Sequence, residues 1–215
     1  MDSNLFIIGV IANIISVMLF ISPIPTMCRV VRRRSTGEFP SSPYVFTLLN
    51  ALVWLYYGLT KPDGFLVATV NGFGPPWRPS MWSSSLSTPS IMKQGIAMLA
   101  AAVDIATFGV LFLITTFAIN ELGLRIMVIG MICMCLNIVM YGSPLAAMLS
   151  FFLSFALFLN GGVWATYAVI DRDIFIGIPN GIGLVLGTIQ LIIYAIRASQ
   201  NHNGRFQHLL PPDID

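Results

Sequence analysis

The uncharged apolar windows of this chain constrain its fold more than any other feature. A helix that crosses a bilayer needs about 20 predominantly apolar residues. Stretches of at least that length lie at 5–28, 39–60, 94–120, 126–170 and 174–196. The window 94–120 is interrupted only by Asp104, and 126–170 is long enough for two helices that separate after Pro144. Another window begins at Gly64 and breaks off at Pro75-Pro76-Trp77-Arg78-Pro79. These windows predict seven helices in an all-α transmembrane fold, the third of them defective.

The composition excludes the soluble classes of protein. Hydrophobic residues make up 56% and charged residues 9%, whereas soluble chains average about 45–50% and 25%. A net charge of +2 excludes a nucleic-acid-binding surface, and the three cysteines lie in or beside apolar runs. No cluster of His, Cys, Asp or Glu indicates a metal, and no catalytic set can be assembled within the spans. We therefore expect a non-enzyme without cofactor or metal, solvated by the lipid bilayer.

The positions of Lys and Arg predict the orientation. With the N-terminus on the non-cytosolic side, eight of these residues fall on cytosolic segments and three on the opposite side. The cytosolic set is Arg29, Arg32, Arg33, Arg34, Arg78, Lys93, Arg197 and Arg205; the other is Lys61, Arg125 and Arg172. The prediction is a multi-pass protein with a cytosolic C-terminus.

The chain repeats itself in the same order in its two halves. Gly9 to Pro23 aligns with Gly130 to Pro144 at an offset of 121. The motif Leu-Asn-x-x-Val-Trp-x-x-Tyr at 49–57 returns at 159–167, and Asn-Gly-x-Gly at 71–74 returns at 180–183.

The predicted units are a three-helix repeat at 4–92 (irregular from 75), a connector helix at 93–120, a second repeat at 126–197 and a disordered cytosolic tail at 198–215. An odd number of helices separates corresponding members, so the repeats are parallel. Carriers built from repeats bind substrate at the repeat interface near the bilayer midplane.

Four motifs carry a family resemblance. They are Asn13-Ile14-Ile15-Ser16, Ser22-Pro23-Ile24-Pro25-Thr26, Tyr141-Gly142-Ser143-Pro144-Leu145 and Pro179-Asn180-Gly181-Ile182-Gly183. With the seven-helix repeat architecture (PQ-loop/SWEET-like), these resemble the plant SWEET sugar transporters, over roughly 4–74 and 93–197. The short N-terminus and the stretch 160–164 are most similar to the vacuolar branch. The resemblance implies a bidirectional uniporter of mono- or disaccharides, with a hexose such as fructose or glucose expected, that works by alternating access in the vacuolar or plasma membrane. We also expect it to assemble as a homo-oligomer or with other family members.

The resemblance also implies the site residues. The pocket positions are Asn71, Asn180, Trp54, Trp164, Asn50, Asn160, Ser16, Asn137, Leu19 and Met140. The asparagine pair 71 and 180 would hydrogen-bond sugar hydroxyls, and the indoles 54 and 164 would sandwich the sugar ring. The gate positions are the hinge prolines Pro23, Pro43 and Pro144 on the cytosolic side and Tyr57, Lys61 and Asp173 on the opposite side.

These residue types have alternative interpretations. Asparagines in membrane bundles also join helices by hydrogen bonds, and tryptophans also anchor helices at the interface. The prolines are also typical of helix ends. Asp104 is the only carboxylate within a span; proton coupling is one hypothesis, and a structural or snorkelling role is favoured because it lies outside both repeats.

The repeat breaks in two places. Twenty-seven positions separate Pro23 from Asn50 but only sixteen separate Pro144 from Asn160, and Ser150 stands where the family has a fourth proline. The third helix meets consecutive prolines, which each cost about 3 kcal/mol within a helix. The alternative function is therefore a transport-defective splice or gene-model variant that at most modulates intact relatives by assembling with them. A seven-helix receptor and an amino-acid carrier are less favoured, because the repeat and the uncharged pocket fit neither.

Overall fold

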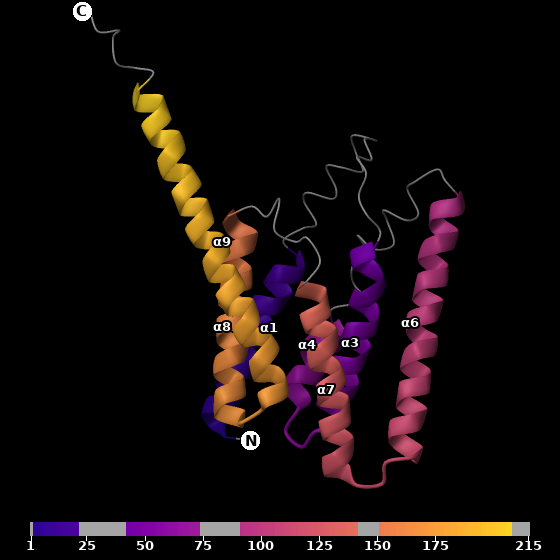
Figure 1. Cartoon of the computed structure of the whole chain (residues 1–215). Helices are drawn as coiled ribbons and strands as arrows, with labels where there is room; N and C mark the ends of the chain where they lie inside the picture. Colours follow the sequence, from indigo (N-terminus) through magenta and orange to yellow (C-terminus); the bar gives the residue numbers. More distant parts are fainter. Residues whose placement is uncertain (1, 22–41, 74–90, 142–150, 208–215) are drawn as a thin grey trace, which may run out of the picture.

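A computed structural model of the chain describes residues 2–21, 42–73, 91–141 and 151–207. Every regular element in this part of the chain is a helix (Figure 1). The helices are α1 (Ser3–Ile21), α3 (Ser42–Thr60), α4 (Phe65–Phe73), α6 (Ile91–Phe117), α7 (Leu122–Tyr141), α8 (Phe151–Asp171) and α9 (Ile174–Gln207). The predicted all-α fold with seven helices is confirmed for the described residues.

The described parts of three helices reach the residues directly before proline-containing motifs. α1 ends just before Ser22-Pro23, α4 ends just before Gly74-Pro75, and α7 ends just before Gly142-Ser143-Pro144. Pro43 lies in the first turn of α3, where its missing N–H has no intrahelical partner to lose. Pro23, Pro144 and Ser150 lie outside the described residues. The window 126–170 holds two separate helices, α7 and α8, as predicted, and residues 142–150 between them lie outside the described residues.

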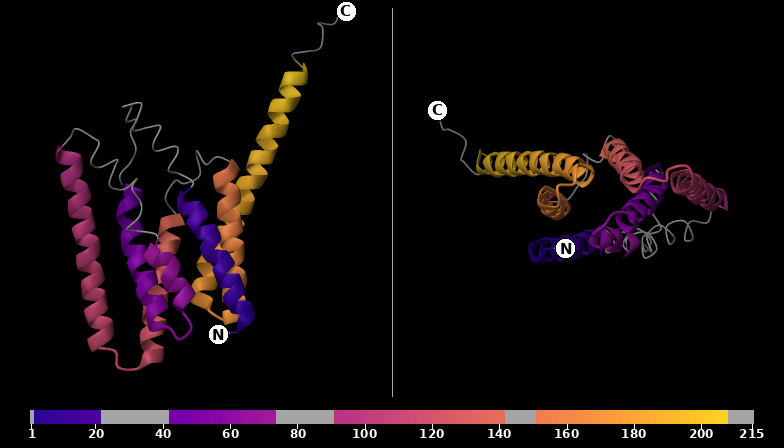
Figure 2. Two further views of the ribbon diagram at one scale, coloured as in Figure 1. Left: turned by 180° about the vertical axis from the view of Figure 1, so that it is seen from behind. Right: turned by 90° about the horizontal axis from the view of Figure 1, so that it is seen from below.

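Six helices form a closed ring. Going around it, α1 contacts α4, α4 contacts α3, α3 contacts α7, α7 contacts α9, α9 contacts α8, and α8 contacts α1. The view from below in Figure 2 shows this arrangement, with α6 outside the ring beside α3. The connector helix therefore adds no wall to the interior of the ring.

The ring has the symmetry that the sequence repeat predicts. In each repeat the third helix packs between the first and the second, which gives α1–α4–α3 and α7–α9–α8. The two contacts between repeats, α1 with α8 and α3 with α7, are also equivalent. Corresponding helices run in the same direction in Figure 1. Exchanging the repeats leaves this pattern unchanged, as expected for parallel repeats about a common two-fold axis.

Gly9 and Gly130, a repeat-related pair, allow the first and third helices of each repeat to approach closely. A Cβ on Gly9 would lie 2.4 Å from the Leu66 Cδ1 of α4, and a Cβ on Gly130 would lie 2.6 Å from the Phe175 Cδ2 of α9. The same Cβ atoms would lie 3.0 Å from the rings of Tyr167 and Tyr57 respectively. Each glycine therefore lies where the first helix of its own repeat contacts a tyrosine of the other repeat.

α6 packs on α3 through an aromatic and hydroxyl contact. Tyr56 meets the rings of Phe108 and Phe112 edge-on, and its hydroxyl lies 3.1 Å from the Thr115 Oγ1 and 3.0 Å from the Thr116 Oγ1. Asp104 on the same helix is 3% exposed. This burial argues against the snorkelling role and leaves the carboxylate within the protein.

Three described helical segments are long and apolar enough to cross a membrane by themselves: Met98–Phe117, Leu122–Met140 and Ile174–Gln200. Ser3–Leu19 and Leu48–Thr60 are shorter apolar segments. Many large apolar side chains point outward; on α6 these include Met98, Leu99, Val103, Ile105 and Val110. An apolar outer surface is the arrangement expected for a protein solvated by lipid.

The predicted boundaries need two corrections. The connector helix begins at Ile91, within the segment predicted to be irregular. The predicted disordered tail begins in the wrong place, because α9 continues to Gln207. Extending an existing helix adds one hydrogen bond per residue without a new nucleation cost, and Ala198, Gln200 and Gln207 are good helix formers. Residues 208–215 lie outside the described residues.

α4 is the shortest helix of the ring. Its nine residues rise about 14 Å, roughly half of the hydrocarbon thickness. Its equivalent α9 has 34 residues. The prediction that this helix is too short to span in regular form concerns residues from 75 onward, and residues 74–90 lie outside the described residues.

Asn13 joins this short helix to α1. Its Nδ2 donates hydrogen bonds to the Leu66 carbonyl of α4 and to the Gly9 carbonyl of its own helix, both at 2.9 Å. The Thr69 hydroxyl donates to the Asn13 Oδ1 at 3.0 Å. The repeat-related positions hold Met134 and Ile178, so the second repeat has no equivalent polar contact.

We predict that Asn13→Met, which copies the residue of the second repeat, lowers the free energy of unfolding by about 1–2 kcal/mol, the upper range for interhelical hydrogen bonds in membranes. Thermal unfolding in detergent measures the change. Thr188→Val is the control, because the exposed Thr188 hydroxyl bonds only to the Leu184 carbonyl of its own helix. Equal shifts for the two variants would show that the α1–α4 contact does not depend on Asn13.

Candidate functional site

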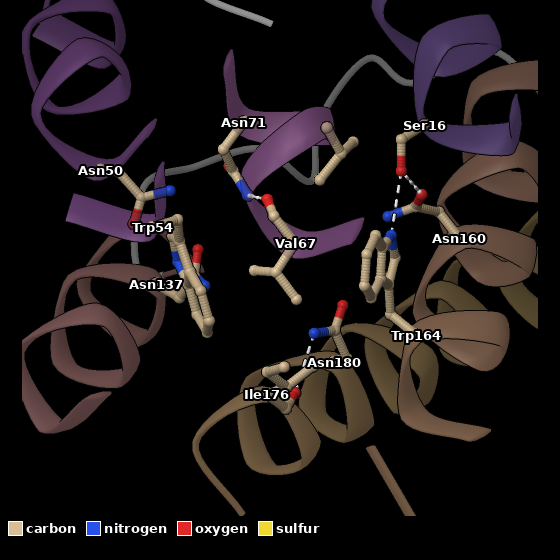
Figure 3. A pocket seen from close by; sticks show the side chains of 11 residues that line it. Ser16, Asn50, Trp54, Val67, Asn71, Asn137, Asn160, Trp164, Ile176 and Asn180 are labelled. Carbon is tan, nitrogen blue, oxygen red and sulfur yellow. Dashed lines mark hydrogen bonds between the residues drawn. The ribbon is translucent and has the colours of Figure 1, made fainter. Parts of the chain in front are cut away.

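A cavity of about 200 Å³ lies inside the ring of six helices. Figure 3 shows the side chains around it, with Trp54 and Trp164 on opposite sides. None of the lining residues is charged. They are Ser16, Asn50, Trp54, Val67, Val70, Asn71, Asn137, Asn160, Trp164, Ile176 and Asn180.

Ten of these eleven residues form repeat-related pairs. The pairs are Ser16 with Asn137, Asn50 with Asn160, Trp54 with Trp164, Val67 with Ile176, and Asn71 with Asn180. Each helix of the ring contributes, because each pair comes from equivalent helices of the two repeats. The cavity is thus centred on the axis that relates the repeats.

Asn71 and Asn180 are held in the same way in the two repeats. The Asn71 Nδ2 donates to the Val67 carbonyl at 2.9 Å, and the Asn180 Nδ2 donates to the Ile176 carbonyl at 2.8 Å. Each bond runs one turn back along the helix that carries the asparagine. The amide nitrogen is therefore turned toward its own backbone, and for Asn180 Figure 3 shows the amide oxygen directed into the cavity.

The two indoles are buried and supported by tyrosines. Trp54 and Trp164 are each 5% exposed. Trp54 meets the ring of Tyr57 edge-on with centroids 5.5 Å apart, and Trp164 meets the ring of Tyr167 in the same way at 5.3 Å. These contacts restrict both indoles to one orientation, with their rings against the cavity.

The polar groups of the α1–α8 wall bond to one another. The Trp164 Nε1–H donates to the Ser16 Oγ at 3.0 Å, and the Ser16 hydroxyl donates to the Asn160 Oδ1 at 2.6 Å. On the α3–α7 wall the Asn50 Oδ1 is buried and has no hydrogen-bond partner within the described chain. The two walls therefore differ in hydrogen bonding although their residue types nearly match.

A group of hydrogen-bonded charges closes one end of the ring. The Tyr57 hydroxyl donates to the Asp173 Oδ2 at 2.8 Å. Lys61, which directly follows the last residue of α3, forms ion pairs with Asp171 at 2.5 Å and with Asp173. The Asp173 Oδ1 also accepts the backbone N–H of Phe175 at 3.0 Å and of Ile176 at 3.1 Å, so this residue caps α9.

Among the described residues, the hydrogen bond from tyrosine to carboxylate forms on one side of the two-fold axis only. Gly64 precedes α4 as Asp173 precedes α9, so the first repeat has no carboxylate at the equivalent place. The Tyr167 hydroxyl, equivalent to that of Tyr57, is buried without a hydrogen-bond partner in the described part of the chain. The two tyrosines thus share a position but not a contact.

Eight of the ten predicted pocket residues line the cavity. Leu19 and Met140 do not; they lie half-buried on α1 and α7, three positions beyond Ser16 and Asn137. Val67, Val70 and Ile176 were missed, as was Asp171 in the charged group. Val67 and Ile176 precede Asn71 and Asn180 by one helical turn, a spacing that would have placed them on the same face. The described residues contain no group of three potential metal ligands.

Two parallel three-helix repeats around an uncharged polar cavity define a membrane transporter of the repeat-built class. A family model described as "Sugar efflux transporter for intercellular exchange" matches residues 6–75 and 127–202. The unmatched interval contains the whole of α6, which lies outside both repeats.

Relatives that this chain resembles are also named sugar transporters. The chain is 43% identical over 203 residues to bidirectional sugar transporter SWEET17 of Arabidopsis thaliana, which covers 89% of this chain and 84% of the relative. It is 40% identical to SWEET16 of the same plant, with 88% of each chain covered. The solved structure of a eukaryotic SWEET transporter superposes with a TM-score of 0.83 at 32% identity, covering 91% of this chain and 97% of that one. The chain belongs to the SWEET family of sugar transporters.

The different contacts of the Tyr57 and Tyr167 hydroxyls predict different effects when each hydroxyl is removed. Tyr57→Phe removes a hydrogen bond to a charged group and should lower the free energy of unfolding by about 1.5–3 kcal/mol. Tyr167→Phe removes a buried hydroxyl without a partner and should leave the stability unchanged or raise it. Thermal unfolding of both variants in the same detergent measures the difference. A loss of stability in Tyr167→Phe as large as that in Tyr57→Phe would contradict the asymmetric closure.

Proposed function

We propose that this chain is a bidirectional uniporter of an uncharged monosaccharide, a hexose such as fructose or glucose, that works by alternating access. The observation that carries the proposal is the lining of the cavity. Five repeat-related pairs bring amides, indoles and one hydroxyl around a space without any charge. Its relatives are named bidirectional sugar transporters, which supports the same substrate class.

The lining fits the chemistry of a sugar. A monosaccharide has apolar C–H faces and a rim of hydroxyls that both donate and accept hydrogen bonds. The Trp54 and Trp164 rings offer flat apolar surfaces on opposite sides. Asn71 and Asn180, whose amides both donate and accept, approach from the third helices of the two repeats. An amino acid would leave its carboxylate and ammonium without charged partners here.

The gates belong to opposite ends of the ring. Tyr57, Lys61 and Asp173 close the non-cytosolic end, and Asp171 adds a second carboxylate for Lys61. These ion pairs are largely buried, with side-chain exposures of 16% for Lys61, 13% for Asp171 and 1% for Asp173, so this end of the ring is closed in the structure. Pro23, Pro43 and Pro144 act as hinges of the cytosolic gate in this proposal, and the C-terminus is cytosolic. The vacuolar membrane is the proposed location, the plasma membrane being the alternative.

Uptake of radiolabelled glucose and fructose into proteoliposomes tests the proposal. We expect the unmodified chain to equilibrate one of these sugars without an ion gradient. Asn71→Ala and Asn180→Ala should each lower the initial rate by about tenfold or more, because the sugar hydroxyls that these amides bond are left without partners in the cavity. Asn4→Ala makes the same substitution at an exposed position of α1 and should leave the rate unchanged. Rates that are unaffected by both cavity substitutions contradict the proposal.

A second candidate function rests on the length of α4. The described part of α4 reaches Phe73, two residues beyond Asn71, and Pro75-Pro76 follow in the sequence, whereas its equivalent α9 continues for 27 residues beyond Asn180. A chain with a shortened third helix that still assembles with intact relatives would reduce their transport. In this alternative the protein is a transport-defective variant that acts only by oligomerising.

Co-expression with an intact SWEET in a transport-deficient cell separates the two functions. A carrier adds to the uptake of its partner, whereas a defective variant lowers it and shows none alone. A repaired chain, with residues patterned on 184–196 after Gly74 and a loop inserted after Met148, is the positive control. If the unmodified chain transports as fast as the repaired one, the second candidate is wrong.

A further inference from the structure

The aliphatic residues that line the cavity all come from the third helices of the two repeats. They are Val67 and Val70 on α4 and Ile176 on α9, and each is at most 6% exposed. Val67 and Ile176 are a repeat-related pair, each one helical turn before the cavity asparagine of its own helix. Because α4 and α9 run in the same direction, both side chains lie toward the same end of the cavity (Figure 1). We call this pair the apolar floor.

The apolar floor lies next to the closed end of the ring. The Ile176 N–H donates to the Asp173 Oδ1 at 3.1 Å, and Asp173 belongs to the charged group that closes this end. The Val67 N–H donates at 3.0 Å to the carbonyl of Gly64, directly before α4. A molecule in the cavity therefore meets aliphatic side chains at this end before it reaches a charge.

The backbone groups of Val67 and Ile176 are already hydrogen-bonded. The Val67 carbonyl accepts the Asn71 Nδ2 at 2.9 Å, and the Ile176 carbonyl accepts the Asn180 Nδ2 at 2.8 Å. Within its helix, each carbonyl also accepts the backbone N–H of the same asparagine, so both of its lone pairs are used. A sugar hydroxyl placed against the floor would lose its hydrogen bonds to water and gain none from these two residues.

We infer that the apolar floor receives a methyl group of the substrate, so that the cavity takes 6-deoxyhexoses as well as hexoses and binds them more tightly. Among the hydroxyl-bearing carbons of glucopyranose only C6 lies outside the ring. Removing its hydroxyl leaves a projecting methyl group, which gains by burial against aliphatic side chains. The ring hydroxyls stay available to the asparagine amides. This inference rests on the proposed function, because it extends the substrate class of the same cavity.

Binding of 6-deoxy-D-glucose to the unmodified chain tests the inference, with D-glucose and D-fructose measured alongside. Binding is followed as the rise in Tm with sugar concentration, and L-glucose is the control for osmolyte effects. We expect 6-deoxy-D-glucose to bind about fivefold to a hundredfold more tightly than D-glucose, the range by which an apolar pocket disfavours an added hydroxyl. 3-Deoxy-D-glucose should bind no more tightly than D-glucose, because removing a ring hydroxyl leaves no projecting methyl group.

Threonine variants place the effect at the floor. Val67→Thr replaces one methyl group by a hydroxyl and nearly keeps the shape of the side chain. It should reduce the advantage of 6-deoxy-D-glucose to about twofold or less, because the 6-hydroxyl of D-glucose gains a partner. Ile176→Thr adds a hydroxyl from the other repeat and takes the place of Val67→Thr if that variant does not fold. Val185→Thr makes the same change at an exposed position of α9 and should leave the ratio of affinities unchanged.

The outcomes distinguish the inference from the proposed function. If no D-sugar raises the Tm above the L-glucose control, both are overturned. If D-glucose or D-fructose binds and 6-deoxy-D-glucose binds no more tightly, the sugar site stands and the role of the floor is wrong. An advantage that 3-deoxy-D-glucose shares, or that persists in both Val67→Thr and Ile176→Thr, also contradicts that role. An advantage that Val67→Thr abolishes and Val185→Thr keeps supports it.

Discussion

Closure of the ring by two equivalent contacts, α1 with α8 and α3 with α7, is the constraint on which the rest of the structure depends. Polar side chains in a lipid-solvated bundle must face the protein interior, because the hydrocarbon offers them no hydrogen bonds. The closed ring provides one interior, and the two-fold arrangement brings five residue pairs to it from opposite sides. A chamber lined by amides and indoles is the result of that geometry.

Symmetry of the backbone does not impose symmetry on the chemistry. Where the halves carry the same residue, as with Asn71 and Asn180, the hydrogen bonds are the same. Where one partner differs, the bonding around it differs too: Ser16 links Asn160 and Trp164, and Asp173 holds Tyr57 while Gly64 leaves Tyr167 without a partner. Single residue differences between the two repeats therefore make the two sides of the site chemically different.

The sequence predicted most of the fold and much of the site, because charges, prolines and the repeat leave marks that are independent of tertiary structure. Uncharged windows located the helices, and the repeat offsets identified the asparagine and tryptophan pairs. The misses have physical causes. Val67 and Ile176 carry no chemical mark that would set them apart from the apolar residues around them. The continuation of α9 through a polar segment depends on extension of an existing helix, which composition does not reveal. The hinge prolines 23 and 144 lie outside the described residues.

The central claim, that the two repeats hold one uncharged chamber with an indole on each side, is tested most directly by tryptophan fluorescence. Replacing Trp77 and Trp82 by Phe leaves Trp54 and Trp164 as the only indoles, and quenching by acrylamide is measured with and without the transported sugar. The account predicts that sugar lowers the quenching of this variant, in which both cavity indoles are kept. Quenching that is unchanged by a sugar which the same variant transports would contradict it.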